Sequence, residues 1–284
     1  MISYPNKGLR FINVNNLSGI LGLIFLFFNF FIPNCVSGQA SAGARTFSLG
    51  QAGVALYDDP WALFQNPALM KTNRSAVSFY AMRYAGLQEL TDFSTAITIP
   101  VSAGTFGFGA HYYGFDLFRE TTFHLAYMKS FGSFSFGLIG SGYHIHIAKG
   151  YGSAWATGLS GGFAFTPSDK VRIGTRVRNI NQPSYSDSKE MLFRELATGI
   201  SYKITSDLNF FSELSKDVRF PVSLRSGLEF RIIQNFFLRS GFTTEPNTWS
   251  FGFGFQSGFL QVNIAVQRHE VLGLSPAMDT GLYF

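Results

Sequence analysis

Apolar residues recur at every second position in many short segments of this chain, and this period constrains the fold more than any other feature. Residues 249–256 place Trp and Phe at odd positions and Ser, Gly and Gln at even positions. Residues 260–267 alternate Leu, Val and Ile with Gln, Asn and Ala. Because successive side chains of a strand point to opposite faces, each segment predicts a strand with one apolar face.

The composition of the other face bears on whether these strands lie in water or in lipid. That face consists largely of Gly, Ala, Ser and Asn, with arginines on a few strands. Only 14% of the residues are charged and 17% are aromatic, with 33 Phe, whereas a soluble domain carries about 25% charged residues. The pattern therefore favours an all-β membrane barrel, and a soluble β-sandwich is the alternative.

Residues 74–284 are expected to form a transmembrane antiparallel β-barrel of about 14 strands. After residue 38 no apolar run is long enough for a membrane-spanning helix, and only a closed barrel satisfies the backbone of strands in lipid. Every second connection is very short, which is typical of periplasmic turns that alternate with longer external loops. In residues 132–147 the apolar positions change phase, so we expect a β-bulge at Gly140–Gly142. The expected strands are 74–84, 91–101, 104–113, 119–130, 132–147, 153–166, 169–179, 194–204, 207–216, 221–232, 235–243, 247–257, 259–268 and 276–284.

Residues 1–38 have the organisation of a cleaved signal peptide. Lys7 and Arg10 precede the apolar run 17–32, and small residues at 36–38 provide a cleavage site before Gln39. A membrane anchor is the alternative. The single cysteine, Cys35, lies inside this segment, where lipid attachment in place of removal is a second alternative. Export would place the mature chain in the outer membrane.

Residues 39–73 precede the first strand and are expected to form an N-terminal hatch that plugs the barrel mouth. Asp59 is a suitable N-cap and Pro60 a suitable first residue for one small helix, which Asn66–Pro67 should end after about two turns. A periplasmic tail is the alternative, but it would expose Trp61. The residues expected to characterise the hatch are Asp58, Asp59, Pro60, Trp61, Asn66 and Pro67.

Several charged residues occupy strand positions that should face the lumen. One interpretation is a pore with a preference for anions. The other, which we favour, is a network of cross-strand ion pairs that fills the interior, because buried charges are rarely left unpaired. The expected lumen charges are Arg172, Arg176, Arg178, Glu195, Glu213, Arg225, Glu229, Arg231 and Arg239.

No arrangement of residues predicts catalysis, a metal site or a cofactor. His144 and His146 share one strand face, but no carboxylate or Cys accompanies them in sequence. No spacing singles out a nucleophile with a base, so we expect no enzyme activity. The net charge of +5, about +3 after removal of residues 1–38, is too small to indicate nucleic acid as a partner. The expected partners are the lipid bilayer and the barrel-assembly machinery, because the terminal Phe284 resembles the signal that this machinery reads.

The segment from Ala44 to Leu69 also resembles a known family. Its Gly50-Gln51-Ala52-Gly53 and Asp59-Pro60-Trp61 stretches, followed by Asn66-Pro67-Ala68, are similar to the start of the FadL-like outer-membrane transporter superfamily, and closer to its PorV/PorQ branch. The resemblance implies a fourteen-stranded barrel with an N-terminal hatch. For the PorV/PorQ branch it implies a scaffold or adaptor of type IX secretion, whose partners are secretion-system proteins. For the transporter branch it implies hatch-gated uptake of small hydrophobic compounds such as fatty acids, released by a lateral opening. The short external loops of this chain depart from the transporters.

Overall fold

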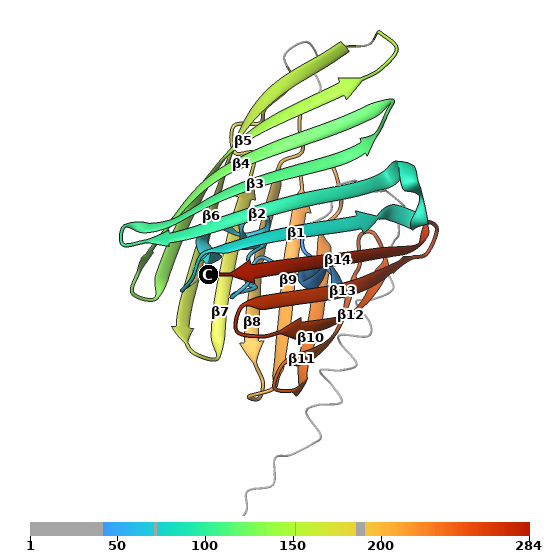
Figure 1. Ribbon diagram of the computed structural model, residues 1–284. Coiled ribbons are helices and arrows are strands. Elements are labelled where there is room, and N and C mark those ends of the chain that lie inside the picture. The colour runs from blue at the N-terminus through green and yellow to red at the C-terminus, as the bar shows by residue number, and fades with distance from the viewer. Residues whose placement is uncertain (1–41, 71–72, 151, 186–190) are drawn as a thin grey trace, which may run out of the picture. The chain divides into compact units, whose positions relative to one another are not determined.

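The structure is a computed structural model, which describes residues 42–70, 73–150, 152–185 and 191–284. The predicted signal peptide lies outside these residues. Fourteen antiparallel strands form a closed barrel, in which each strand pairs with its neighbours in sequence and β1 pairs with both β2 and β14 (Figure 1). The predicted fold class and number of strands are confirmed.

The strands are β1 (Ala76–Arg83), β2 (Thr91–Val101), β3 (Gly104–Phe115), β4 (Phe118–Phe131), β5 (Phe134–Ile147), β6 (Gly152–Ser168), β7 (Val171–Arg178), β8 (Glu195–Lys203), β9 (Leu208–Asp217), β10 (Ser223–Ile233), β11 (Phe236–Thr243), β12 (Thr248–Gln256), β13 (Leu260–His269) and β14 (Gly273–Tyr283).

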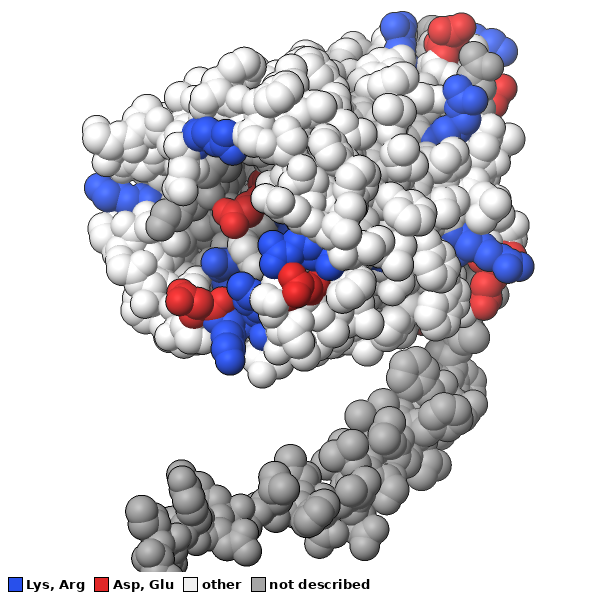
Figure 2. All heavy atoms as spheres, turned by 60° about the horizontal axis from the view of Figure 1, so that its bottom comes forward, with Lys and Arg blue, Asp and Glu red and all other residues white. Residues whose placement is uncertain are grey.

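The outer face of the barrel is apolar, as the alternation predicted. On β12, Trp249 and Phe253 are 55% and 63% exposed, whereas Ser250 between them is fully buried. Figure 2 shows one face of the molecule, where charged side chains gather in small clusters and around a hollow and leave most of the surface uncharged. In the described part of the chain, no helix is long and apolar enough to span a membrane. On β12 the large apolar side chains thus point out of the barrel and the small ones point into it.

The predicted bulge in β5 is wrong. β5 pairs with β4 and β6 in an uninterrupted register. Gly140 and Gly142 lie on the outer face, while Ile139 and Tyr143 point inward and are 6% exposed. Tyr143 points inward because its hydroxyl donates to Oδ1 of Asn179, at 2.9 Å. The register shifts of the sheet fall elsewhere, between β6 and β7 and between β10 and β11.

The alternation of short and long connections is weaker than expected. The strands extend further than predicted at two places, so residues 116–117 alone join β3 to β4, and residues 270–272 join β13 to β14. The longest connection, residues 179–194, joins β7 to β8, as predicted. The first connection contains the 3₁₀ turns η3 (Tyr84–Gly86) and η4 (Gln88–Leu90). We call the end of the barrel that carries these connections the loop end.

Residues 42–70, which we call the inner segment, lie inside the barrel and contain two short α-helices instead of the one expected. These are α2 (Ala44–Ser48) and α3 (Ala62–Gln65), followed by the 3₁₀ turn η2 (Pro67–Leu69). The helix predicted from Pro60 is a single turn that begins later. The Asp59 carboxylate instead accepts the N–H of Trp61, at 2.8 Å, and the Asp59 carbonyl accepts the N–H of Ala62. This local turn delays the helix.

The inner segment fits the lumen because glycines line the wall where its backbone runs. A Cβ added to Gly227 of β10 would lie 2.6 Å from the carbonyl oxygen of Leu49. Similarly, Cβ atoms at Gly174 and Gly241 would collide with backbone atoms of Val54 and of Leu49 and Gly50. Only glycine permits such a close approach of two backbones. The inner face of the sheet is thus shaped for this segment, which fills the lumen at this level.

Candidate functional site

A buried group of charges joins α2 to the wall of the barrel. Arg45 donates from Nε and Nη2 to both carboxylate oxygens of Glu229, each at 2.8 Å. Arg239 of β11 donates to the same carboxylate from Nε, at 2.7 Å. Asp279 of β14 accepts the backbone N–H of Ala44, at 2.6 Å. These side chains are at most 10% exposed, so the ion pairs are short, shielded from solvent and shared between wall and inner segment.

A second carboxylate holds the next part of the inner segment. Oε2 of Glu213 accepts the backbone N–H groups of Gly53 and Val54, at 2.9 and 2.8 Å. Its other oxygen accepts from Arg225, at 2.9 Å. Arg176 lies 3.8 Å from Glu213 and also pairs with Glu195. Each charge of this cluster therefore has a partner of opposite sign or a backbone dipole.

The Asn66–Pro67 turn is a third anchor. The side-chain amide of Asn66 donates to the carbonyl of Val54, at 2.8 Å, and to that of Phe163 in β6, at 3.2 Å. Its Oδ1 accepts the N–H of Ala68, at 3.1 Å. Gly162 lies against Asn66 and Pro67, and Gly137 lies against Pro67 and Ala68. Asn66 thus links the inner segment to itself and to the wall, which gives a physical reason for this residue at this turn.

The structure brings seven of the nine predicted lumen charges into these two clusters, and it places the other two outside them. Arg231 of β10 pairs with Asp207, which lies in the turn between β8 and β9, at 2.7 Å. Both side chains are about half-exposed. Arg172 lies over the ring of Tyr57, at 3.9 Å. The others form the buried pairs of the favoured interpretation. Of the predicted hatch residues, Asp59, Trp61, Asn66 and Pro67 are buried, while Asp58 is exposed and has a positive φ of 51°.

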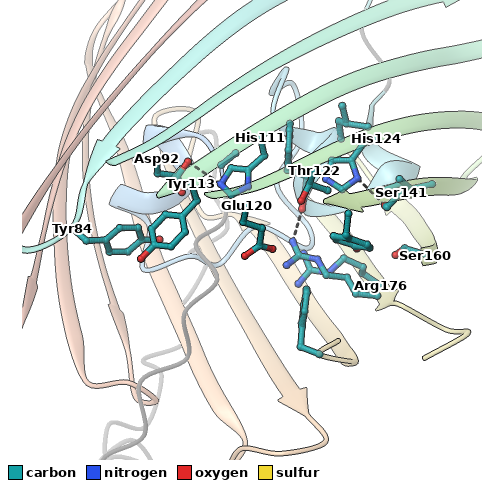
Figure 3. Close-up of a pocket in the computed structure, with 17 residues that line it drawn as sticks. Tyr84, Asp92, His111, Tyr113, Glu120, Thr122, His124, Ser141, Ser160 and Arg176 are labelled. Atoms are coloured by element: carbon teal, nitrogen blue, oxygen red, sulfur yellow. Dashed lines mark hydrogen bonds and ion pairs between the residues drawn. The ribbon is translucent and has the colours of Figure 1, made fainter. Parts of the chain in front are cut away.

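A partly open cavity, which we call the vestibule, lies between the inner segment and the loop ends of β2–β7. Its volume is about 80 Å³, which leaves room for several water molecules. Leu63 and Phe64 of the inner segment contribute apolar lining. Figure 3 shows Tyr84, Tyr113, Asp92 and His111 on one side and Arg176 and Ser160 on the other. A small molecule that enters from the loop end would meet the inner segment here.

The two sides of the vestibule differ in charge. On one side, Nε2 of His111 lies 3.0 Å from the carboxylate of Asp92, and the half-buried Glu120 points into the cavity (Figure 3). On the other side, the guanidinium of Arg178 donates to the carbonyl of Phe64 and lies 4.0 Å from Glu195. Between them His124 contacts Phe64 edge-to-face, at 5.0 Å, and hydrogen-bonds to Ser141. The vestibule therefore has an acidic side and a basic side.

The barrel wall next to the vestibule is incompletely paired. β6 and β7 pair over Gly161–Phe165 and again at Ser168, so residues 152–160 of β6 have no partner on β7 in this register. Ile180, in the connection after β7, covers part of this stretch and donates to the carbonyl of Leu159, at 2.7 Å. On the outer face an apolar depression of about 610 Å³ lies over Gly137, Gly161 and Gly162. Only glycine backbone separates this depression from the Asn66–Pro67 turn.

Sequence reasoning missed Arg45 and all the residues of the acidic side. Arg45 gives no local signal, because its partner Glu229 lies 184 residues away in the chain. Glu120 could have been found from its position in β4. Residues 120, 122, 124, 126 and 128 of this strand face inward, while 123 and 125 are exposed. Parity within the strand would have assigned Glu120 to the lumen.

His144 of the pair discussed above lies against an aromatic ring. The ring of His144 lies 4.4 Å from that of Trp155, on β5 and β6. Within the described residues, no group of three or more His, Cys, Asp or Glu could hold a metal ion. Phe284 is 71% exposed, and its N–H donates to the carbonyl of Ser75, at 2.9 Å. Its recognition by assembly machinery stays a prediction.

Solved structures of known proteins share the fold of this chain. No protein-family model matches the chain, and no relative is found among curated proteins. The solved CymD monoaromatic hydrocarbon channel is similar, with a TM-score of 0.68 and 11% identity over 88% of this chain and 99% of that one. The Pseudomonas putida toluene transporter TodX gives 0.61 and 10% over 88% and 99%. A FadL homologue of Pseudomonas aeruginosa gives 0.59 and 10% over 87% and 98%. The PorV/PorQ branch receives no support from these comparisons. At these identities the likeness concerns architecture alone, so the chain has the barrel fold of the FadL/TodX-type hydrocarbon channels.

Proposed function

We propose that this protein is a non-enzymatic, hatch-gated channel for small hydrophobic compounds, located in the outer membrane. The observation that carries the proposal is the incomplete pairing of β6 with β7, beside the vestibule on the inside and the apolar depression on the outside. The inner segment fills the lumen at the glycine-lined level, so an open aqueous pore is not the route. Two similar solved structures, a monoaromatic hydrocarbon channel and a toluene transporter, support the same class of cargo.

The proposed route runs sideways. Cargo enters the vestibule from the loop end, meets Leu63 and Phe64, and leaves between β6 and β7 into the depression on the outer face. An apolar molecule gains by this path because it passes from water to a hydrocarbon environment. The Asn66–Pro67 turn closes the wall from inside, since it lies against Gly137 and Gly162. Movement of this turn is the gating step.

The gate is tested by a reversible cross-link. Pro67→Cys with Gly137→Cys, in a Cys35→Ser background, places two thiols whose Cβ atoms start 2.7 Å apart. A disulfide needs about 3.8 Å. Because a Cβ at Gly137 also lies 2.4 Å from the backbone of Pro67, the turn must shift by roughly 1 Å in the reduced and the oxidised state alike, and the comparison is made between the two states of one variant. We expect toluene uptake into proteoliposomes to stop after oxidation and to recover after reduction, with Gly137→Cys alone as the control. Equal uptake in both states would exclude movement of this turn.

The lateral route is tested by filling the depression. Gly161 lies under it, with its Cβ direction 3.6 Å from Ile180, so Gly161→Phe should block passage. Gly140→Phe is the matched control, because Gly140 also faces outward and has no neighbour within 4 Å. We expect uptake to fall only in the first variant. If both variants transport like the wild type, the route does not pass through β6 and β7.

A scaffold or adaptor role is the second candidate. The buried ion pairs that fix the inner segment to the wall favour this role, because a protein that does not transport needs no movement of that segment. It predicts a stable protein partner after extraction in mild detergent. Purification of the barrel alone under several such conditions, together with toluene uptake by that barrel, would count against the scaffold.

Export and membrane location belong to the same proposal. Cleavage after residue 38 predicts that N-terminal sequencing of the mature protein begins at Gln39. Fractionation should recover the protein with the outer membrane. Recovery in the aqueous fraction would contradict both the location and the channel.

A further inference from the structure

The lining of the vestibule combines an apolar part with many ionisable groups. Binding pockets for apolar ligands are lined mostly by apolar side chains with a few polar ones. Here the apolar part consists of Ala42, Leu63, Phe64, Ile139 and Phe193, and a larger number of ionisable and hydroxyl-bearing side chains accompanies it. We infer that the cargo bound in the vestibule is a small apolar molecule that carries a protonated amine. This inference rests on the proposed channel function and names the class of its cargo.

The acidic side is built by one row of residues across three strands. Tyr113 of β3 lies directly opposite Asp92 of β2 and directly opposite Glu120 of β4. Directly opposed residues of neighbouring strands have Cβ atoms about 5 Å apart. The register therefore places two carboxylates on either side of one aromatic ring, at the mouth of the vestibule.

The carboxylates of this row exceed the nearby positive charge. Asp92 is 2% exposed and pairs with His111. In the described part of the chain no Lys or Arg forms an ion pair with Glu120, whose carboxylate points into the cavity (Figure 3). The imidazole of His111 pairs with Asp92 and leaves Glu120 without an ion pair among the described residues, so with both carboxylates ionised the net charge of the row is −1 when His111 is protonated and −2 when it is neutral. A half-buried site of negative charge is stabilised by a cation.

Aromatic rings next to this charge make the site suitable for an ammonium group. Tyr84 and Tyr113 contact each other edge-to-face, with ring centroids 6.0 Å apart. Both rings line the vestibule together with Glu120. An ammonium group is attracted to the face of an aromatic ring and to a carboxylate, and recognition of organic cations commonly combines the two.

The basic side of the vestibule is less suited to bind an anionic cargo than the acidic side is to bind a cation. Arg178 donates to the carbonyl of Phe64 and has Glu195 at 4.0 Å. Arg176 donates to the carbonyl of Gln65 and pairs with Glu195. These guanidinium groups already have acceptors. A bound amine would direct its ammonium group to Glu120 and lay its apolar part over Leu63 and Phe64.

The test compares four one-ring compounds that differ in charge: benzylamine, benzyl alcohol, benzoate and toluene. Binding to the full-length protein in lipid nanodiscs is measured by calorimetry at neutral pH. We expect benzylamine to bind at least about tenfold more tightly than benzyl alcohol, because a hydrogen bond between charged groups contributes that much more than one between neutral groups. Glu120→Gln should remove this preference and leave toluene binding unchanged. Glu89→Gln, an exposed acid in the first connection, is the matched control and should keep the preference.

The outcomes separate this inference from the function on which it rests. If toluene binds or is taken up but benzylamine has no advantage, or if benzoate binds best, the amine inference is overturned and the channel stands. If none of the four compounds binds or passes, both are overturned. If Glu120→Gln retains the preference for benzylamine, the assignment of the site is wrong.

Discussion

The inner segment is expected to loosen when Glu229 is removed, because this carboxylate is shared by two buried arginines. Glu229→Ala takes away the carboxylate that is shared by Arg45 and Arg239, whose side chains are 10% and 3% exposed, and leaves Arg45 with Asp59 at 3.5 Å and Arg239 with Asn263 as remaining partners. Removing one member of a buried ion pair costs about 3–5 kcal/mol, since the other charge stays buried without a partner. Part of that cost is relieved when the inner segment leaves the wall, so it favours release of the segment.

The expected change is large enough to measure. If release relieved the whole cost of about 3–5 kcal/mol, the population of the released segment would rise by roughly two to nearly four powers of ten, and because the relief is partial we expect a rise below that bound. Hydrogen exchange followed by mass spectrometry on peptides from residues 42–56 reports this population, because amides of this stretch donate to Asp279 and Glu213. The assay is made on the full-length protein in nanodiscs, after circular dichroism has confirmed the barrel.

Two further variants make the result interpretable. Asp207→Ala breaks the pair with Arg231, which lies two residues from Glu229 on β10 but faces solvent, so exchange of the inner segment should not change. A triple variant with Arg45→Met, Glu229→Leu and Arg239→Met replaces the charges by apolar groups and should restore much of the protection. Exchange in Glu229→Ala at the wild-type rate, in a folded barrel, would refute the reasoning.

Three other perturbations follow from the contacts of the inner segment. Gly227→Ala pushes a Cβ to 2.6 Å from the carbonyl of Leu49 and should destabilise docking by about 1–3 kcal/mol in the same exchange assay, whereas the outward-facing Gly140→Ala should have no such effect. Asn66→Ala leaves the buried carbonyl of Val54 without its donor and should cost about 1–3 kcal/mol; normal protection of residues 62–70 in this variant would contradict the anchoring role. Burial raises the pKa of Asp59 above its ordinary value of 3.8, although Arg45 at 3.5 Å opposes this. The docked segment therefore holds this proton more tightly than the released one, so the contribution of Asp59 to docking is greatest below pH 3.8 and is lost as the pH rises through the raised pKa. Asp59→Asn should remove that part of the pH dependence. If hydrogen exchange of the variant followed the wild-type profile from about pH 3 to about pH 6, Asp59 would not be its cause.

The barrel was predictable because inside and outside alternate along each strand, which is a local property of the sequence. Trp249, Ser250 and Phe251 show the rule clearly, since each side chain is large or small according to its face. The rule failed in β5 because glycine occupies outward positions 140 and 142, where it gives no sign of its face. The inward Tyr143 then gave a false change of phase. Its hydrogen bond to Asn179, 36 residues further along the chain, could not be read from the local pattern.

The sites were less predictable because their partners are distant in sequence. The lumen arginines followed from strand parity, but the pairing of Glu229 with Arg45 depends on how the inner segment folds back. The vestibule required knowledge of strand register, since Asp92, Tyr113 and Glu120 become neighbours only when β2, β3 and β4 are aligned. A shift of register by one residue would turn each of these side chains to the other face.

The tight contact between the inner segment and the glycine-lined wall has a consequence for the order of assembly. Residues 42–70 immediately precede β1, whose pairing with β14 closes the circle. If that seam formed first, the segment would have to enter a closed barrel before its backbone could reach the wall at Gly174, Gly227 and Gly241. We therefore expect the segment to be seated before, or together with, the last pairing. Pulse labelling during refolding should show protection at residues 42–56 no later than at the β1–β14 seam.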